Sequence, residues 1–215
     1  MAGHYYDASF PITSLTGSLL WALNYAYWLR RQRYEGIQIF LVDIWKIPVD
    51  RFYPAQFLAE YLDVPPLNMP WHDDPYHEYF VFGGVPSSAI LGSSDLLPWV
   101  AIGMHTLLPA LDDIHRNEGL LQSLHRLQMG WIDGSGWLLE GDRHISRKAI
   151  AYAYEITDSF LRYSDKEFRF PIAMMFLSLR RRDWDEEAWV NIQSEFKGVW
   201  LKTQILCQFW TSLTL

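Results

Sequence analysis

A cluster of histidine and aspartate side chains has the residue types that bind a metal ion. His72, Asp73, Asp74 and His77 lie close together in the sequence, and imidazole with carboxylate is a common zinc ligand set. No cysteine pair accompanies these residues, and the surrounding segment is rich in proline and is expected to be a loop that holds ligands poorly. The sequence therefore predicts no metal cofactor.

Hydroxyl and carboxyl side chains form a second group of candidates. Ser14, Thr16 and Ser18 occupy alternate positions, and capping the start of a helix is the simplest role for them. Glu78 opens a strand-like run, where it is either a site residue or a solvated residue at a strand end. Asp43 closes another such run, where it is either a site residue or an acid that forms a turn.

Other chemistry-bearing patterns are missing from the sequence. It contains no Walker loop, no Gly-x-Gly-x-x-Gly and no Gly-x-Ser-x-Gly, so the enzyme classes that depend on these motifs lose their main support. The single cysteine, Cys207, lies among apolar residues on a predicted helix, where a buried and inert thiol is expected.

The front of the chain should position the first candidates with helix and strand elements in alternation. A helix is predicted over residues 18–34, because apolar helix formers follow the possible caps and Gly36 can end it. It is apolar almost all round, which favours a buried position. The further elements expected are a strand at 37–44, a short helix at 52–61, a loop at 64–75, a strand at 78–84 and a short strand at 89–91.

After about residue 95 the pattern becomes helical. Apolar residues between Ile150 and Leu161 recur at helical spacing behind Ser146 as a plausible N-cap. A helix is expected over 170–181, and Asp183 with Glu186 resembles a capping box that opens another. This last helix should bury Trp189, Phe196 and Trp200. The expected fold is therefore α+β, with an α/β part at 1–94 and a helical part at 95–215 packed on it.

Composition excludes several classes of partner. The 215 residues are half apolar and carry a net charge of -7, and without clustered cations nucleic-acid binding is not expected. The apolar segment 96–111 is shorter than the roughly 20 residues that span a bilayer, and the N-terminus does not resemble a signal peptide. A soluble, cytoplasmic protein without a membrane partner is predicted.

The order of motifs in the front part resembles the ADP-ribosyltransferase-like fold. Ser-Leu-Thr-Gly-Ser at 14–18 opens a helix, a strand ends in Val42-Asp43, and Glu-Tyr-Phe-Val-Phe-Gly-Gly-Val-Pro follows at 78–86. The similarity covers about residues 9–92 and is strongest to uncharacterised fungal proteins that carry a divergent copy of this fold followed by a helical region. It implies a small split mixed β-sheet.

The resemblance also implies a role for each front candidate. Glu78 would hold the ribose of NAD and stabilise the ribosyl cation as nicotinamide leaves. Ser14, Thr16 and Ser18 would support the nicotinamide pocket by hydrogen bonding, and either Tyr79 or Tyr25 would offer it a ring. His4, the only His or Arg before Ser14, would replace the first-strand residue that grips NAD. A tyrosine, Tyr76, stands where arginine-directed transferases carry a second acid, so arginine is not the expected target.

Two functions follow from the resemblance. The favoured one is a non-catalytic descendant, a pseudoenzyme or effector that binds a protein partner, because few residues precede Ser14 and because tryptophan and tyrosine, which anchor interfaces, are abundant. The alternative is an active NAD-dependent mono-ADP-ribosyltransferase or NAD hydrolase that uses Glu78. A plain helical interaction protein remains a third alternative.

Overall fold

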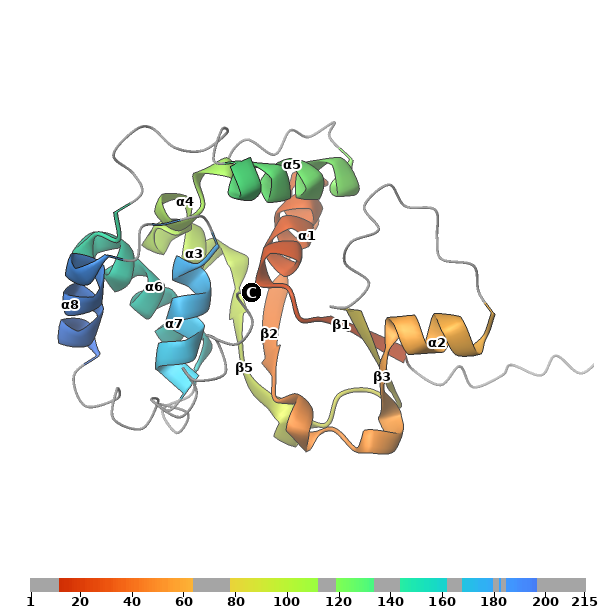
Figure 1. The fold of residues 1–215 in the computed structure, drawn as a ribbon. Helices are drawn as coiled ribbons and strands as arrows, with labels where there is room; N and C mark the ends of the chain where they lie inside the picture. The colour runs from red at the N-terminus through yellow and green to blue at the C-terminus, as the bar shows by residue number, and fades with distance from the viewer. Residues whose placement is uncertain are drawn as a thin grey trace, which may run out of the picture. The chain divides into compact units, whose positions relative to one another are not determined.

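Contacts along the chain group its residues into two units in the computed structural model (Figure 1). The first, called here the front unit, consists of Met1–Ser18 and Val42–Ile90, and the second, the helical unit, consists of Leu19–Leu41 and Leu91–Leu215. The structure describes residues 12–63, 78–111, 119–133, 144–161, 168–179, 182 and 185–196. The expected sequential division at residues 94 and 95 differs from this grouping, because the first helix and the strand after it group with the helical unit.

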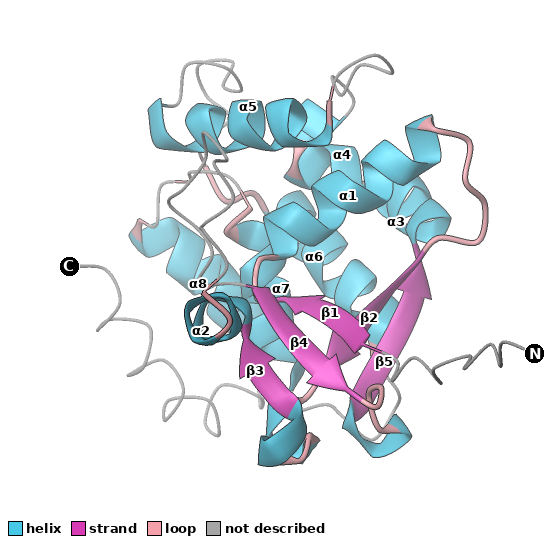
Figure 2. Cartoon of the chain, turned by 90° about the vertical axis from the view of Figure 1, so that its right-hand side faces the viewer, coloured by secondary structure: helices cyan, strands magenta, loops and turns pink. Residues whose placement is uncertain are grey.

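The front unit contains a three-stranded antiparallel sheet. Its order is β1-β4-β3, and these strands lie side by side in Figure 2. One face covers a small core in which Ile47, Val81 and Ala89 are buried. The elements of the sheet and its neighbouring helix are β1 (Ile12–Thr16), β3 (Phe52–Pro54), β4 (Glu78–Phe82) and α2 (Ala55–Tyr61). The helix predicted at 52–61 is thus a short strand followed by a shorter helix.

The helical unit begins with α1 (Leu19–Arg31) and β2 (Gln38–Val42).

The helix α1 ends earlier than the sequence predicts. The predicted helix runs to residue 34 and is ended by Gly36, whereas α1 ends at Arg31. The Tyr34 N–H donates to the Leu29 carbonyl at 3.1 Å and the Arg33 N–H donates to the Arg30 carbonyl at 2.9 Å. This is a Schellman motif with Arg33, at φ 68°, in the left-handed position where glycine is usual.

The remaining described part of the helical unit is almost entirely helical, as the sequence predicts. β5 (Ile90–Asp95) pairs with β2, and helices follow it. They are α3 (Leu96–Ile102), α4 (Met104–Leu107), α5 (Leu120–Asp133), α6 (Arg147–Phe160), α7 (Arg169–Leu177) and α8 (Glu186–Glu195). The sheets are antiparallel, so the expectation of a mixed sheet is wrong, whereas the α+β class is confirmed.

An aromatic cluster fills the centre of the helical unit. Trp99 is fully buried, with its ring 4.5 Å from that of Phe160 and 5.4 Å from that of Phe176. Its indole N–H has acceptors at 2.8 Å on Ser159 and at 3.0 Å on Ser94. Burial of these rings removes a large apolar area from water, and the two hydroxyls satisfy the buried donor.

One side of α1 is exposed, although the helix is apolar almost all round. The helix buries Leu23, Ala26 and Tyr27 in the core as expected, but Tyr25 on another side is exposed, so the helix is not enclosed all round. Asn24 is buried too, and its side chain accepts a hydrogen bond from Ser123 of α5 at 2.7 Å. This bond pairs two buried polar groups that would otherwise be costly to remove from water.

Two helix starts test the cap predictions. Ser146 is the N-cap of α6, and its hydroxyl accepts from the Ala149 N–H at 3.2 Å, as predicted. The cap of α8 is Asp185, which accepts from the Ala188 N–H at 2.8 Å, so the predicted capping box that begins at Asp183 is wrong. Along α8 and just beyond it, Phe196 is buried and Trp189 is partly buried, whereas Trp200 lies outside the described residues.

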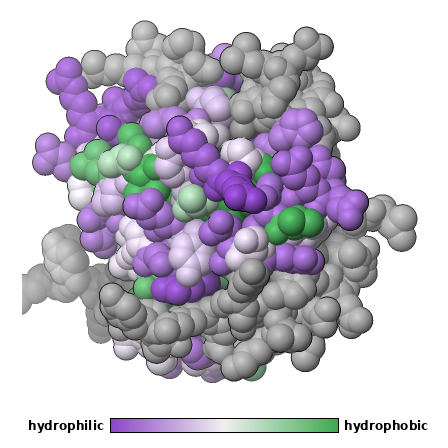
Figure 3. All heavy atoms as spheres, turned by 90° about the vertical axis from the view of Figure 1, so that its left-hand side faces the viewer, coloured by the Kyte–Doolittle hydropathy of each residue, from purple (hydrophilic) through white to green (hydrophobic). Residues whose placement is uncertain are grey.

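Figure 3 views the side where α8 lies in Figure 1, and among the residues coloured there, hydrophilic ones predominate over small separate apolar groups. None of the helices in the described ranges combines the length and the apolar composition needed to cross a bilayer.

Candidate functional site

The β1–β4 pairing brings three of the predicted site residues to one face of the front sheet. In the antiparallel register Thr16 lies opposite Glu78, and Ser14 lies opposite Phe80. Side chains two residues apart on a strand share a face, so Ser14, Thr16 and Glu78 all project from the same side. The segments that supply them are 64 residues apart at Ser14 and Glu78.

A direct hydrogen bond joins two of these side chains. The Ser14 hydroxyl donates to Glu78 Oε1 at 2.9 Å, and both residues are exposed. The bond orients the carboxylate, while Oε2 has no protein donor within the described ranges. The pair therefore offers one free carboxylate oxygen and a fixed hydroxyl to any group that approaches this face of the sheet.

Thr16 and Ser18 take part in the turn between β1 and α1. The Ser18 N–H donates to Thr16 Oγ1 at 3.0 Å, which is the local hydrogen bond of a Ser/Thr turn. Thr16 therefore closes the turn before α1, but it accepts from the N–H of Ser18, which precedes the helix, so it does not cap a helical N–H. Ser14 lies within the strand and bonds to Glu78 instead.

Of the two aromatic candidates, Tyr79 does not share the face of the Ser14–Glu78 pair. Tyr79 follows Glu78 on the strand and so points to the opposite face, where its ring stacks on Phe52 at 5.0 Å. Tyr25 belongs to the helical unit and stacks on Trp28 with ring centroids 6.2 Å apart. His4 lies outside the described residues, as do His72 to His77 and Cys207.

The turn after β2 gives Asp43 a structural role. Its side chain accepts from the Trp45 N–H at 3.1 Å and forms an ion pair with Lys46 at 3.5 Å. These contacts make Asp43 the cap of a 3-10 turn at Ile44–Lys46, which corresponds to the turn-forming alternative.

Large apolar side chains are exposed on the front unit. Trp45 is 91% exposed, Val49 is 88% exposed and Tyr61 is 84% exposed. Others on the same unit are Ile12, Ile44, Tyr53, Phe57 and Leu62. The sequence motifs predict no role for these residues. One sequence feature could have indicated this exposed set. In the run Ile44-Trp45-Lys46-Ile47-Pro48-Val49, neither a helical nor a strand period accounts for the position of every apolar residue.

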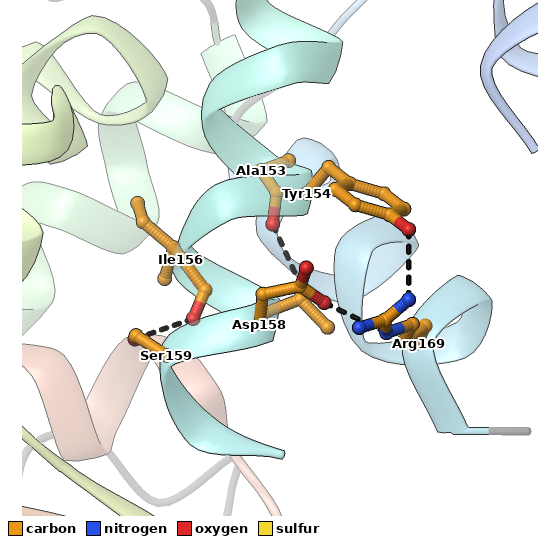
Figure 4. Close-up of polar contacts among 7 residues, drawn as sticks. Ala153, Tyr154, Ile156, Asp158, Ser159 and Arg169 are labelled. Carbon is orange, nitrogen blue, oxygen red and sulfur yellow. Dashed lines mark hydrogen bonds and ion pairs between the residues drawn. The ribbon is translucent and has the colours of Figure 1, made fainter. Parts of the chain in front are cut away.

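A polar cluster in the helical unit is best explained as structural. Arg169 of α7 forms an ion pair with Asp158 of α6 at 2.7 Å and donates to the Tyr154 hydroxyl at 3.0 Å (Figure 4). All three side chains lie at the α6–α7 contact and are partly buried. Arg169 and Asp158 are paired with each other, so the cluster links the two helices and leaves little charge for a ligand to bind.

No group of three or more His, Cys, Asp or Glu side chains that could hold a metal ion occurs among the residues that the structure describes.

A family model, Domain of unknown function (DUF7587), matches residues 7–98. No curated protein and no solved structure matches the chain. The matched segment includes β1, β4 and the Ser14–Glu78 pair, and it ends within α3.

Proposed function

We propose that residues 1–94 are a divergent ADP-ribosyltransferase-like domain that acts as a non-catalytic, cytoplasmic protein-binding module or effector, with residues 95–215 as its helical support. The observation that carries the proposal is the set of exposed large apolar side chains on the front unit, above all Trp45 and Tyr61. Single exposed apolar residues are ordinary, but many on one small unit are typical of a surface that a partner covers. Tryptophan and tyrosine are also the residues that most often anchor interfaces.

A second function, an NAD-dependent mono-ADP-ribosyltransferase or NAD hydrolase, is favoured by the Ser14–Glu78 hydrogen bond. A serine that orients a glutamate at the start of a strand suits stabilisation of a ribosyl cation. We place this function second because both side chains are exposed. Water weakens the attraction between a carboxylate and a developing positive charge, so an open site stabilises that charge less than a dry one.

Calorimetry with NAD and an assay of nicotinamide release separate the two functions. The binding module should give no heat with NAD and no release above background. An enzyme should release nicotinamide, and Glu78→Gln should lower the rate by roughly 100-fold or more, because the charge acts mainly in the transition state. NAD affinity should then change little, whereas His4→Ala should weaken it if His4 grips the cofactor.

Capture of a protein partner on the immobilised chain provides the positive test. Phe57→Ala combined with Tyr61→Ala truncates two exposed aromatic side chains of α2 without removing a buried residue. A specific partner that uses this surface should be lost from the double variant. Glu78-dependent nicotinamide release by the wild type would instead establish the second function.

A further inference from the structure

One part of the exposed apolar surface forms a projecting turn, called here the Trp45 tip and defined as residues 43–51. Ile44, Trp45 and Val49 are exposed on it, and the latter two are almost fully so. Ile47, which lies between them in sequence, is instead buried in the small front core. The buried side chain of Ile47 therefore anchors the tip to the front core, and the outer side of the tip is apolar.

Local hydrogen bonds hold the tip in one conformation. The Asp43 N–H donates to the Ala89 carbonyl at 2.8 Å, and the Asp43 carboxylate accepts from the Trp45 N–H. The Tyr53 hydroxyl donates to the Asp50 carbonyl at 2.9 Å on the far side of the tip. A partner that binds Trp45 consequently meets a preorganised backbone, which lowers the entropy lost on binding.

The charges of the tip are balanced, in contrast to those of the chain. Asp43 and Lys46 neutralise each other, and the adjacent Asp50 and Arg51 carry opposite charges. Both Asp50 and Arg51 are exposed, and neither side chain has an ion pair within the described ranges. The tip is thus a neutral surface with one free charge of each sign on a chain whose net charge is -7.

We propose that the Trp45 tip is a self-association surface and that its occupant is a second copy of this chain. In a two-fold interface the same patch meets itself, so residue i of one copy contacts residue j of the other and the reverse. Asp50 of each copy then faces Arg51 of the other, and Trp45 of each packs against Val49 of the other. Adjacent opposite charges make the tip complementary to itself, and its zero net charge gives it no net electrostatic attraction to anionic lipid headgroups.

This inference rests on the proposed function, since it names the partner that one part of the front-unit surface takes. The tip is small, and a contact well below the roughly 1,200 Å² of a standard interface is transient. We therefore expect a dissociation constant on the order of 100 µM, in the range of weak encounters between proteins.

Sedimentation equilibrium on the full chain tests the proposal. The weight-average mass should rise from 25.3 kDa towards twice that value as the concentration increases. Trp45→Ala should weaken association by about 10-fold or more, as expected for truncation of a central aromatic anchor. Tyr61→Ala is the matched control, since it removes a comparably exposed aromatic side chain outside the tip, and it should associate like the wild type.

Charge reversal tests the pairing itself. Asp50→Arg alone places two cations opposite two cations, and Arg51→Asp alone places two anions opposite two anions, so each variant should remain monomeric. An equimolar mixture restores both opposite-charge contacts and should form mixed dimers with about the wild-type affinity. Exposed residues carry these changes, and circular dichroism checks that every variant keeps its fold.

Three results would overturn the proposal. The first is a wild type that stays monomeric at about 1 mM, which is ten times the expected dissociation constant. The others are equal effects of Trp45→Ala and Tyr61→Ala on association, and charge-reversed variants that do not associate when mixed. Each of them leaves the proposed function standing, because a monomer can still bind a different protein. Nicotinamide release that depends on Glu78 would defeat the proposed function and leave self-association untouched, so the two failures are distinguishable.

Discussion

Gly92 is a position at which a single methyl group should destabilise the helical unit strongly. This residue of β5 forms a bridge with Leu161, just after the end of α6. A Cβ added at Gly92 would overlap the carbonyl oxygen of Phe160 and lie 2.8 Å from its carbonyl carbon, although ordinary contacts begin at 3.4 Å. The obstacle is backbone, so no side-chain rotation relieves it, and either β5 or the end of α6 must move.

That movement would disturb the aromatic cluster. The Phe160 ring packs 4.5 Å from the Trp99 ring, and displacement of the end of α6 separates them. Overpacking of a well-packed site costs typically 1–3 kcal/mol, and backbone obstruction belongs at the upper end, so we expect Gly92→Ala to lower the free energy of unfolding by about 3 kcal/mol.

Urea unfolding followed by tryptophan fluorescence measures this loss. Ser93→Ala is the matched control on the same strand, since Ser93 is exposed, and it should change stability by less than about 0.5 kcal/mol. A Gly92→Ala protein within about 1 kcal/mol of the wild type would refute the close approach of β5 and α6.

Two further changes probe helix ends. Arg33→Gly should raise the free energy of unfolding by about 0.5–1 kcal/mol in urea titrations, because glycine occupies the left-handed position without steric strain. Arg33→Ala is the control, since it removes the same charge but keeps the strain, and an equal gain in stability from it would contradict this account. Ser146→Ala should lower stability by about 1 kcal/mol through loss of the α6 cap, whereas Ser146→Asp should retain most of it; thermal melts of both variants that match the wild type would show that the cap contributes nothing.

Local sequence signals predicted the elements that local chemistry determines. The strand at Glu78 and the cap at Ser146 follow from residue types within a few positions, and both are present. The end of α1 was misplaced because Arg33 adopts a conformation that sequence rules reserve for glycine. The cap of α8 was misplaced by two residues because Asp183 and Asp185 are equivalent cap formers by type alone.

The candidate site depended on information that the local sequence does not contain. Ser14 and Glu78 meet only because β1 and β4 pair in one register, and a shift of that register by one residue would send the two side chains to opposite faces. The same alternation removes Tyr79 from the pair, although it is the neighbour of Glu78 in sequence. The local sequence does not predict the exposure of Trp45 either, because an apolar residue type alone does not distinguish a core residue from a binding residue.

The interrupted course of the helical unit has a consequence for biosynthesis. Its first segment, Leu19–Leu41, leaves the ribosome well before the second, Leu91–Leu215. Tyr27 on the buried face of α1 contacts the ring of His105, and Asn24 beside it bonds to Ser123 of α5, 99 residues further along the chain. The helix therefore lacks these native partners until α5 has been made. Such long-range closure slows folding and leaves an apolar helix open to aggregation. Nascent chains should therefore engage a chaperone at α1, and they should release it only once α5 has emerged.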